Sequence, residues 1–435
     1  MKKHIKLFVV LGILLVGSFS FSLFKGFKKD NMVYKDNKIN PLSSGIAVMF
    51  ETEAGSSNYE MTTRSEWPTE GYVFNANLSK CENGSELSWD NENKKVLMSG
   101  NKSDKCYVYF DVEIPPTIAN TCSSGTNLAS CIKTFGNKGS SVSNIYHHDA
   151  SLTNGAGDNS YRFAGASDQV NNYVCFGSTQ SPCPADNLYR IIGVFGDKVK
   201  LIKSDYATTA LLGADGDYSK MYTANNWDSS AYKGNNLANI AGYTWNYKNN
   251  TSINNGYGSN TWSTSLLNKT NLNKNFITNI GADWAAKIAE TTWKVGGNTW
   301  ANIGTQPAKT AYQNEIVSPV TTNSTDSATE YSAKIGLMYA SDYGFAAAPS
   351  AWTTQLSSYN GEAIKNVNWM YMGLAEWTIS RFADFASNAF IVYYTGSVTN
   401  GRANDALALR PVFYLSSSVN YASGSGTAAD PILVN

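Results

Sequence analysis

The side chains that could support catalysis or metal binding are few in this sequence. His147 and His148 form the only adjacent pair among its three histidines and could act as a base or a metal pair. Neighbouring residues on a strand point to opposite faces, which makes a shared ligand role awkward. Glu376 and Asp384 could serve as the paired carboxylates of a glycan hydrolase, although carboxylates are sparse around them.

Two segments are calcium-like: 154–160 combines Asp, Asn and Gly, and 215–217 reads Asp-Gly-Asp. Neither matches an EF-hand loop, and isolated clusters of this composition are usually turns. The cysteines lack the Cys-x-x-Cys spacing of a zinc site. The sequence therefore predicts no metal and no cofactor, and it leaves calcium dependence open.

The segment 377–415 has a composition that favours recognition over catalysis. It mixes aromatic residues with Asn, Ser and Arg, and it contains turn signals at Thr395-Gly396 and Asn400-Gly401. Tyr, Ser, Gly and Asn supply rigid amphipathic rings and adaptable hydrogen bonds at binding surfaces. The same residue types also dominate large β-rich extracellular domains, so composition alone does not separate the two interpretations.

Bulk composition excludes one class of partner. The chain has 435 residues, with 34 basic residues against 34 acidic ones, and only 16% of its residues are charged. A nucleic-acid-binding protein usually presents a basic field, and this balance provides none. We therefore expect no nucleic acid among the partners.

The N-terminus predicts export. Basic residues precede 7–24, a stretch without charge that would span about 27 Å as a helix, near the thickness of a bilayer core. One interpretation is a signal anchor, which gives a single-pass protein with its N-terminus inside. The other is a signal peptide cleaved near Ser20-Phe-Ser22, which gives a secreted protein. Both place the remainder on the extracellular side of the membrane.

Cysteine usage agrees with an oxidising compartment. Six cysteines allow 15 connectivities, and pairing of nearest neighbours is the economical prediction. The expected disulfides are Cys81–Cys106, Cys122–Cys131 and Cys175–Cys183.

The chain divides into segments of different composition. Residues 25–44 form a polar stalk without periodicity. The unit 45–112 begins with a strand-like alternation at 46–51 and has further strand candidates at 71–74 and 106–112, which predicts a small β-sandwich-like domain stapled by one disulfide. Pro115-Pro116 is typical of a stiff linker. A large unit follows from 117 to 435, and its first part, 117–187, is expected to be a loop-rich lead-in.

Three elements should position the candidate binding segment within the large unit. The run 188–203 predicts a hairpin whose Gly196-Asp197 pair suits a type II′ turn. The segment 263–290 repeats apolar residues every four positions, which predicts helix, and Gly281 should split it. We expect a core strand over 331–340, followed by an exposed turn at 341–344.

Three blocks of the C-terminal half occur in an order typical of one group of proteins: WMYMGLAEWTISR at 369–381, ALALRPVFYL at 406–415 and GSGTAADPILV at 424–434. They resemble bacterial exported proteins, best represented in Firmicutes, that end in a C-type-lectin-like domain of the formylglycine-generating-enzyme type. The hairpin at 189–203 is similar to the strand pair that opens that domain. The resemblance covers roughly 185–435 and implies an α+β fold with a loop-rich lectin-like domain.

In related folds the segment between the Trp and Arg-Pro blocks carries the ligand contacts. The resemblance therefore implies a binding face made of Phe382, Asp384, Phe385, Asn388, Tyr393, Tyr394, Asn400, Arg402, Asn404 and Asp405. Trp377 and Arg410 would be structural, and Arg381 and Arg410 are expected to pair with a carboxylate such as Glu376 or Asp384. The catalytic cysteines, the iron-binding histidines and the calcium-sugar motifs of the related proteins have no counterpart here.

The sequence thus predicts a non-catalytic extracellular protein for surface recognition or adhesion. Its ligand would be a glycan or a protein, and residues 7–24 would hold it in the membrane if they are not cleaved. One alternative is a structural surface protein that assembles with copies of itself. The other is the glycan hydrolase with Glu376 and Asp384.

Overall fold

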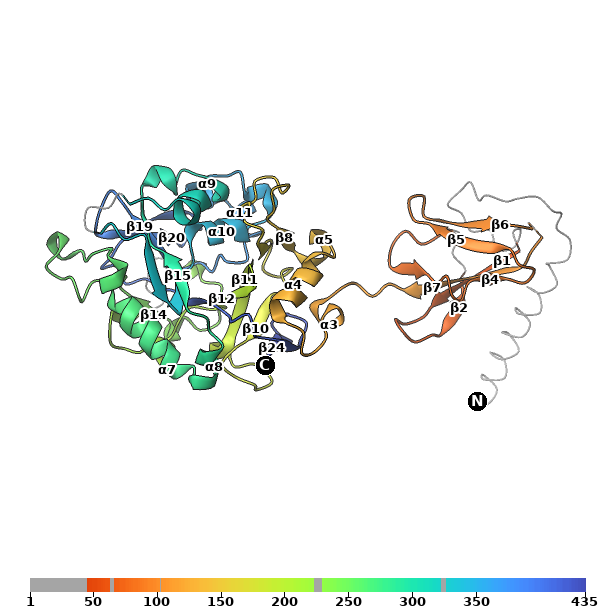
Figure 1. Cartoon of the computed structure of the whole chain (residues 1–435), viewed down its shortest axis with the longest axis horizontal. Coiled ribbons are helices and arrows are strands. Elements are labelled where there is room, and N and C mark those ends of the chain that lie inside the picture. The colour runs from red at the N-terminus through yellow and green to blue at the C-terminus, as the bar shows by residue number, and fades with distance from the viewer. Residues whose placement is uncertain (1–44, 63–65, 102, 223–228, 322–325) are drawn as a thin grey trace. The chain divides into compact units, whose positions relative to one another are not determined.

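The computed structural model describes residues 45–435 except 63–65, 102, 223–228 and 322–325 (Figure 1). The chain divides into two compact units, Met1–Pro115 and Pro116–Asn435. The predicted membrane segment 7–24 and the stalk 25–44 lie outside the described residues. Within the described part of the chain, no helix has the length and apolar character needed to span a bilayer.

Unit 1 is built from short strands. One sheet has the order β2-β1-β7-β3, and β4 also pairs with β7. Strands β5 and β6 form a separate antiparallel pair. The strands are β1 (Ile46–Glu51), β2 (Tyr59–Met61), β3 (Tyr72–Phe74), β4 (Lys80–Cys81), β5 (Glu86–Asp90), β6 (Lys95–Ser99) and β7 (Cys106–Val112).

The core of unit 1 joins its two strand systems. Val48 and Phe110 from the sheet and Val96 from β6 belong to one buried cluster, so the sheet and the β5–β6 pair share a core. The disulfide Cys81–Cys106 links β4 to β7 beside this core. The buried apolar cluster among the described residues of unit 1 is small, and the covalent link adds stability to it.

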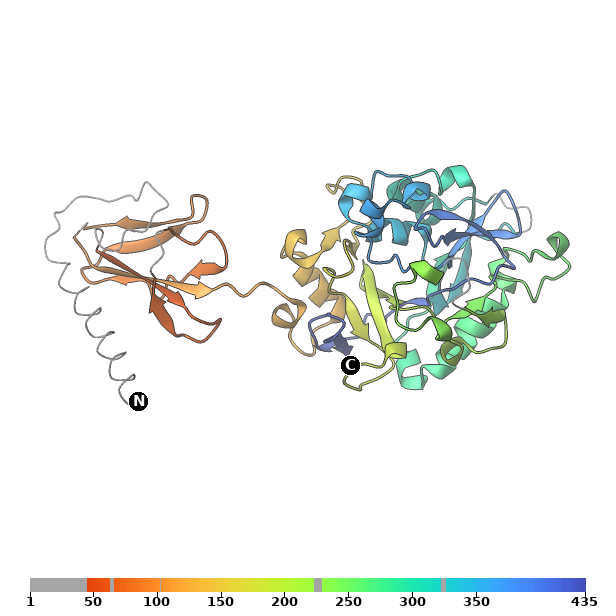
Figure 2. The ribbon, with the colours of Figure 1, turned by 180° about the vertical axis from the view of Figure 1, so that it is seen from behind.

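Unit 2 has a main mixed sheet with the order β18-β22-β12-β11-β10-β24-β23, and β9 connects β11 to β8. The last strand of the chain pairs in parallel with β10, which lies some 260 residues earlier, and Figures 1 and 2 show the dark blue C-terminal strand beside the yellow β10. The strands are β8 (Ile145–His147), β9 (Tyr161–Phe163), β10 (Tyr173–Cys175), β11 (Leu188–Phe195), β12 (Lys198–Lys203), β18 (Ile335–Gly336), β22 (Val412–Tyr414), β23 (Tyr421–Ser423) and β24 (Ile432–Val434).

The predicted hairpin at 188–203 is confirmed as β11 and β12. Phe195 pairs with Lys198 across a two-residue loop. Gly196 has a φ of 63°, the left-handed conformation that the first central position of a type II′ turn requires and that glycine adopts without strain.

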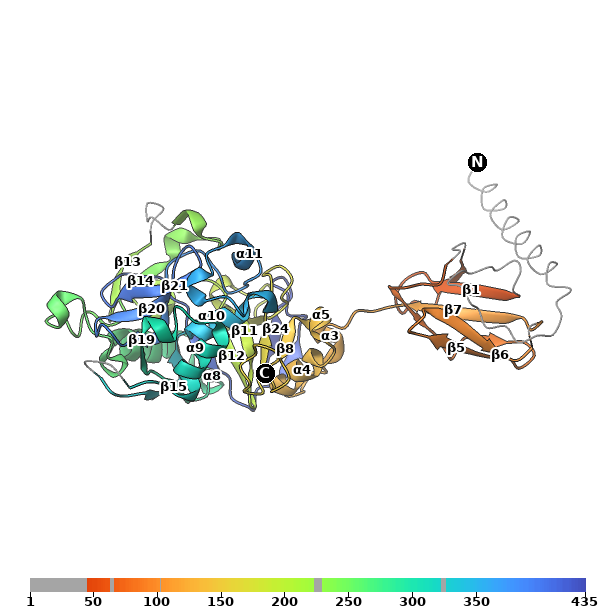
Figure 3. The same cartoon turned by 90° about the horizontal axis from the view of Figure 1, so that it is seen from above.

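A second sheet carries the candidate binding segment. Its order is β16-β19-β20-β21, from β16 (Gly297–Asn298), β19 (Glu376–Phe382), β20 (Asn388–Val392) and β21 (Val398–Arg402). Figure 3 shows β19, β20 and β21 next to one another. Smaller antiparallel pairs join β13 (Tyr218–Met221) to β14 (Ala241–Tyr243) and β15 (Thr291–Lys294) to β17 (Glu330–Ala333).

The helices are short and lie mostly between strands. They are α3 (Ile118–Thr121), α4 (Leu128–Gly136), α5 (Ser140–Ser143), α6 (Thr209–Leu212), α7 (Ile277–Asn279), α8 (Ala282–Ala286), α9 (Ala308–Tyr312), α10 (Ala340–Ala346), α11 (Glu362–Lys365) and the π-helical segments η6 (Leu267–Phe276) and η8 (Gln313–Val317). The predicted helical region at 263–290 is confirmed in η6, α7 and α8. Gly281, with φ of 89°, separates α7 from α8 as expected.

Two expectations about elements are wrong in detail. The exposed turn at 341–344 is instead part of α10, and its Ser341 and Asp342 are buried. Turn-forming residues predict a turn only where they are exposed to solvent. Here the segment is buried and helical, because the buried carboxylate of Glu315 accepts hydrogen bonds from the Ala340 and Ser341 amides at the start of α10. The core strand expected over 331–340 is divided into β17, which ends at Ala333, and β18 at Ile335–Gly336, and Ala340 already belongs to α10. The segment 117–187 contributes α3 to α5 and the strands β8 to β10 between its loops.

All six cysteines lie within the described residues, and the predicted disulfides Cys81–Cys106, Cys122–Cys131 and Cys175–Cys183 are confirmed. The structure is therefore a mixed α+β protein with many strands, short helices and disulfide links in both units.

Candidate functional site

The hairpin of β20 and β21 has two faces that differ in what they touch. Asn388 is paired with Arg402 and Phe390 with Asn400, so these four side chains lie on one face of the hairpin. Ala389, Ile391 and Gly401 alternate onto the other face. A shift of one residue in this pairing would exchange the two faces, so the register decides which side chains reach solvent.

On the inner face, the Trp377 side chain of β19 lies close against β21. A Cβ atom on Gly401 would lie 3.1 Å from Ile391 Cγ2 and 3.2 Å from Trp377 Cη2, so the absence of a side chain lets the strand approach the indole ring. Trp377 is fully buried, and its Nε1 donates to the carbonyl of Tyr243 at 2.8 Å. This contact fixes the position of β21 relative to the core.

An internal ion pair holds the two ends of the segment together. Arg410 donates to both carboxylate oxygens of Glu376, at 2.8 and 2.9 Å, and both residues are buried. Burial raises the pKa of the Glu376 carboxyl, although Arg410 lowers it. The expected pairing of Arg410 with Glu376 is confirmed, and the carboxylate proposed for a hydrolase is enclosed in the scaffold.

Arg381 is also structural, but its partner differs from the expected ones. Its Nη1 lies 2.9 Å from an oxygen of Asp326, and its Nη2 donates to the carbonyl of Ala328. Asp384, in contrast, is exposed on the turn after β19. Glu376 and Asp384 therefore do not share a surface.

Near Asn388 and Arg402, polar side chains on the outer face of the hairpin reach solvent, whereas Phe390 on the same face is buried. The Asn388 amide donates to Asn400 Oδ1 at 3.2 Å, and the Arg402 guanidinium lies 4.4 Å from the centre of the Tyr257 ring. Phe385, on the turn that leads into β20, is 61% exposed. We call Phe385, Asn388, Asn400, Arg402 and Tyr257 the outer face.

Asn404 and Asp405 lie at the border of the outer face. Asn404 Nδ2 donates to the carbonyl of Gly256 at 3.3 Å, whereas its Oδ1 is buried without a hydrogen-bond partner among the described residues. An Asp405 oxygen accepts from the Arg402 amide at 2.8 Å. Burial raises the pKa of the Asp405 carboxyl, against the lowering effect of the hydrogen bond from Arg402.

Phe382 does not belong to the surface where it was expected. It ends the fully buried β19, is only 3% exposed and packs against Phe390 with ring centres 5.1 Å apart. Seven consecutive buried residues in β19 leave no alternation that could place its last side chain in solvent. Phe385 stacks on Phe382 with ring centres 6.0 Å apart, so these aromatic contacts continue from the core to the surface.

Tyr393 and Tyr394 belong to the opposite end of the hairpin. They lie in its turn and contact one another with ring centres 4.5 Å apart. Four residue steps along β20 separate the two ends, which corresponds to about 13 Å. The carbonyl of Tyr394 accepts a hydrogen bond from Tyr371 rather than facing the outer face. The structure thus brings Asp384, Phe385, Asn388, Asn400, Arg402, Asn404 and Asp405 together, and it places Phe382, Tyr393 and Tyr394 elsewhere.

Sequence reasoning missed two residues that complete the site. Tyr257 supplies the ring beneath Arg402. Asn260 is fully buried, and its Nδ2 donates to the carbonyls of Phe382, Phe385 and Asn388, which fixes the turn between β19 and β20. Both come from a polar segment without hydrophobic periodicity, so the only available signal was its richness in Asn and Tyr.

The other candidate groups have structural partners. His147 lies near Asp149 and stacks on Tyr161, whereas His148 is buried against Phe345 and Trp352, so the two rings do not face a shared ligand. Burial, reinforced by Arg162, lowers the pKa of His148 to about 2. Across the described residues, His, Cys, Asp and Glu side chains form no group of three or more suited to a metal ion.

The two calcium-like segments are also satisfied by protein groups. The buried Asp217 carboxylate accepts from the amides of Lys248 and Leu267 at 2.9 Å. Asp158 pairs with Arg162 at 2.6 Å. The carboxylates of both segments therefore serve the fold.

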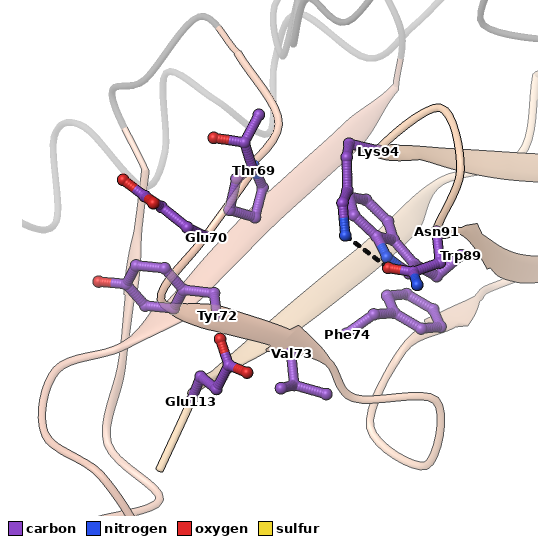
Figure 4. A pocket seen from close by; sticks show the side chains of 10 residues that line it. Thr69, Glu70, Tyr72, Val73, Phe74, Trp89, Asn91, Lys94 and Glu113 are labelled. Atoms are coloured by element: carbon purple, nitrogen blue, oxygen red, sulfur yellow. Dashed lines mark hydrogen bonds between the residues drawn. The ribbon is translucent and has the colours of Figure 1, made fainter. Parts of the chain in front are cut away.

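Unit 1 contains a separate hollow of about 330 Å³. Figure 4 shows Tyr72 and Glu113 on one side of it and Trp89 and Lys94 on the other. Lys94 Nζ donates to Asn91 Oδ1 at 2.6 Å. Trp89 also packs edge-on against Phe110, so the aromatic wall of this hollow is part of the unit's core.

Comparison with protein-family models, with curated proteins and with solved structures finds no match to this chain.

Proposed function

We propose that this chain is an extracellular recognition protein whose outer face binds a glycan or a protein and catalyses no reaction. The observation that carries the proposal is the contrast within one hairpin. Its inner face packs against the buried Trp377. Its outer face presents the exposed Phe385 ring, the side-chain amides of Asn388 and Asn400, and the Arg402 guanidinium. Such a combination suits a surface that must bind without rearranging its scaffold.

Each group on the outer face has a defined role in this proposal. Phe385 and Tyr257, which are 61% and 39% exposed, provide apolar area that a sugar ring or an aromatic side chain can cover. The amides of Asn388 and Asn400 donate and accept hydrogen bonds and so orient the ligand. Arg402 adds a cation that is already held against Tyr257.

The scaffold proposed for this face is C-type-lectin-like, of the formylglycine-generating-enzyme type. This assignment rests on the ordered blocks at 369–381, 406–415 and 424–434 and is supported by the mixed α+β architecture. The disulfides support a location outside the cytoplasm, since such links persist in oxidising compartments. Residues 7–24 would anchor the chain or be removed on secretion.

The test is a screen of the full chain on arrays of glycans and bacterial or host surface proteins. The Arg402→Ala and Tyr257→Ala variants should each lose binding to the ligand that the wild-type chain selects, by about tenfold for an aromatic or arginine anchor. A matched control, Lys309→Ala, removes an exposed cation far from β21 in sequence and should bind like wild type. Unchanged binding by both face variants would overturn the assignment of this site.

Self-assembly is the other function that an exposed Phe385 would serve, because a second copy could cover the ring. Light scattering of the full chain over a range of concentrations separates the two. Growth of oligomers that Phe385→Ser abolishes, together with no ligand on the arrays, would favour the structural role. A monomer at all concentrations would favour recognition.

A further inference from the structure

Unit 2 contains a cavity of about 350 Å³ that is separate from the outer face. Strands β10 and β11 contribute Tyr173 and Arg190, the loop before β14 contributes Lys233, and the segment after α11 contributes Tyr371. This volume is at the lower end of the range that holds small ligands. The cavity therefore has room for a group about the size of one sugar unit.

The charges around this cavity are not fully paired. Arg190 is buried, and all its hydrogen bonds go to neutral acceptors, among them Asn172 Oδ1 at 2.6 Å and the carbonyl of Val170 at 2.9 Å. No carboxylate of the described residues lies within 4 Å of its guanidinium. The ring of Tyr173, 4.3 Å away, and that of Trp369, 4.6 Å away, flank the cation. Burial lowers the pKa of Arg190 to about 10.

Lys233 is the accessible cation of the cavity. Its ammonium group lies 4.6 Å from the centre of the Tyr371 ring and makes no hydrogen bond or ion pair with the described residues. Lys365, 5.7 Å from the same ring, is held by Glu362 at 2.5 Å. Burial lowers the pKa of Lys233; Glu362 raises it and Lys365 lowers it. A bound anion would offset the cost of partly burying the charged ammonium group of Lys233.

The remaining polar groups suit hydroxyls. Asp168 and Asp205 line the cavity together with Ser204 and Asn235. Asp205 is held in place, because its oxygens accept from the Tyr206 amide and from the Tyr232 hydroxyl, both at 2.7 Å. Carboxylates and amides held in fixed positions are acceptors and donors for sugar hydroxyls.

The loop that carries Lys233 is positioned in advance. The Lys233 amide donates to the carbonyl of Met372 at 2.9 Å. A Cβ atom on Gly373 would lie 1.7 Å from the carbonyl oxygen of Ala231, so the two segments touch through their backbones. This close contact keeps Lys233 beside Tyr371 before any ligand arrives.

We propose that this cavity is a second binding site and that it takes a sugar carrying a carboxylate, such as a uronic or sialic acid. The carboxylate pairs with Lys233, within the field of Arg190 and Lys365. The hydroxyls of the ring bind the Asp205 side of the cavity, and the apolar edge of the sugar packs on Tyr371. A neutral sugar would leave Lys233 without its partner and bind more weakly.

Calorimetry with the full chain tests the proposal. The probes are a tetrasaccharide of alternating glucuronate and N-acetylglucosamine, its carboxyl-reduced counterpart, and 3′-sialyllactose. At least one acidic probe should bind, and in the glucuronate series carboxyl reduction should weaken binding at least tenfold. Lys233→Ala should weaken binding similarly, Lys233→Arg should retain it, and Lys309→Ala should not alter it.

The outcomes separate this site from the outer face. Arg402→Ala should bind the acidic probes like wild type, whatever the arrays show for the outer face. Failure of both acidic probes to bind at millimolar concentration would overturn the proposal. So would equal binding of the acidic and the carboxyl-reduced tetrasaccharide, or unchanged binding by Lys233→Ala.

Discussion

Strands β19 and β21 belong to one sheet, but only β21 presents side chains to solvent. Every residue of β19 is buried, and its Glu376 and Arg381 have ionic partners inside the protein. In β21, Asn400 and Arg402 are exposed, and their side chains contact Asn388 and Tyr257 on the outer face. Strand β20 lies between them. Its residues 389–392 are buried, and Asn388 at its start contributes to the outer face.

The difference shows how a fixed scaffold can carry an adaptable surface. The side chains that hold the sheet in place come from β19 and from Arg410. The outer face is positioned mainly by the backbone hydrogen bonds between β20 and β21. Substitution on the outer face should therefore change binding with little change in folding. Matched residues in the two environments provide ways to test this contrast.

The largest effect should come from the two arginines. Arg410→Met leaves the buried Glu376 carboxylate without its partner, and we expect unit 2 to lose about 3–5 kcal/mol in its free energy of unfolding. Arg402→Met makes the same change on the outer face and should cost less than about 1 kcal/mol. Urea denaturation followed by tryptophan fluorescence measures both. Equal losses would mean that β21 is as much scaffold as β19.

The two phenylalanines give a similar contrast. Phe382→Ala opens a cavity beside Phe390 and should cost about 3 kcal/mol. Phe385→Ala removes a ring that is mostly in solvent and should stay within about 0.5 kcal/mol of wild type. Melting temperatures of the two variants test the assignment. A strongly destabilised Phe385→Ala would show that this ring belongs to the core.

Asn260 connects the two environments, because it donates to carbonyls on both sides of the turn after β19. Asn260→Ala leaves the carbonyls of Phe382 and Asn388 without this donor, and we expect a loss of about 2 kcal/mol. Hydrogen exchange should become faster around 382–388 and stay unchanged in the hairpin of β11 and β12. Uniform acceleration over unit 2 would contradict a local positioning role.

The adjacent histidines extend the comparison to pH. The pKa of the buried His148 is lowered to about 2, below its value of about 6.5 in the unfolded chain, so the unfolded state binds the proton first as pH falls. The stabilising effect of keeping this ring neutral is present above pH 6.5, and about 1.4 kcal/mol of it should be lost by pH 5.5. Unfolding free energies of wild type and His148→Gln at pH 7.5 and 5.5 test this, with His147→Gln as the control. Parallel pH dependence in all three proteins would contradict it.

Local chemistry made much of the fold predictable from the sequence. Short spacing between cysteines limited their pairing, the Gly196-Asp197 turn fixed a hairpin, and Gly281 ended a helix. The pairing of Arg410 with a nearby carboxylate followed from the high cost of burying a charge alone. Each of these inferences needs only neighbouring residues or one strong energetic term.

The errors arose where distant residues decide the outcome. The turn-like residues at 341–344 are helical because Glu315, distant in sequence, binds the amides at the start of α10. The candidate segment looked like one surface, yet the length of β20 separates Tyr393 from Arg402 and the burial of β19 hides Phe382. Tyr257 and Asn260 reach the site from a segment whose composition indicates only a loop.

The most direct test of the central claim is a single experiment on a triple variant, Phe385→Ser, Asn400→Ala and Arg402→Ala. Its melting temperature and its affinity for the ligand selected on the arrays are measured in the same preparation of the full chain. We predict a melting temperature close to that of wild type and an affinity at least a hundredfold weaker. Wild-type affinity in this stable variant, or a collapse of the fold, would contradict the account.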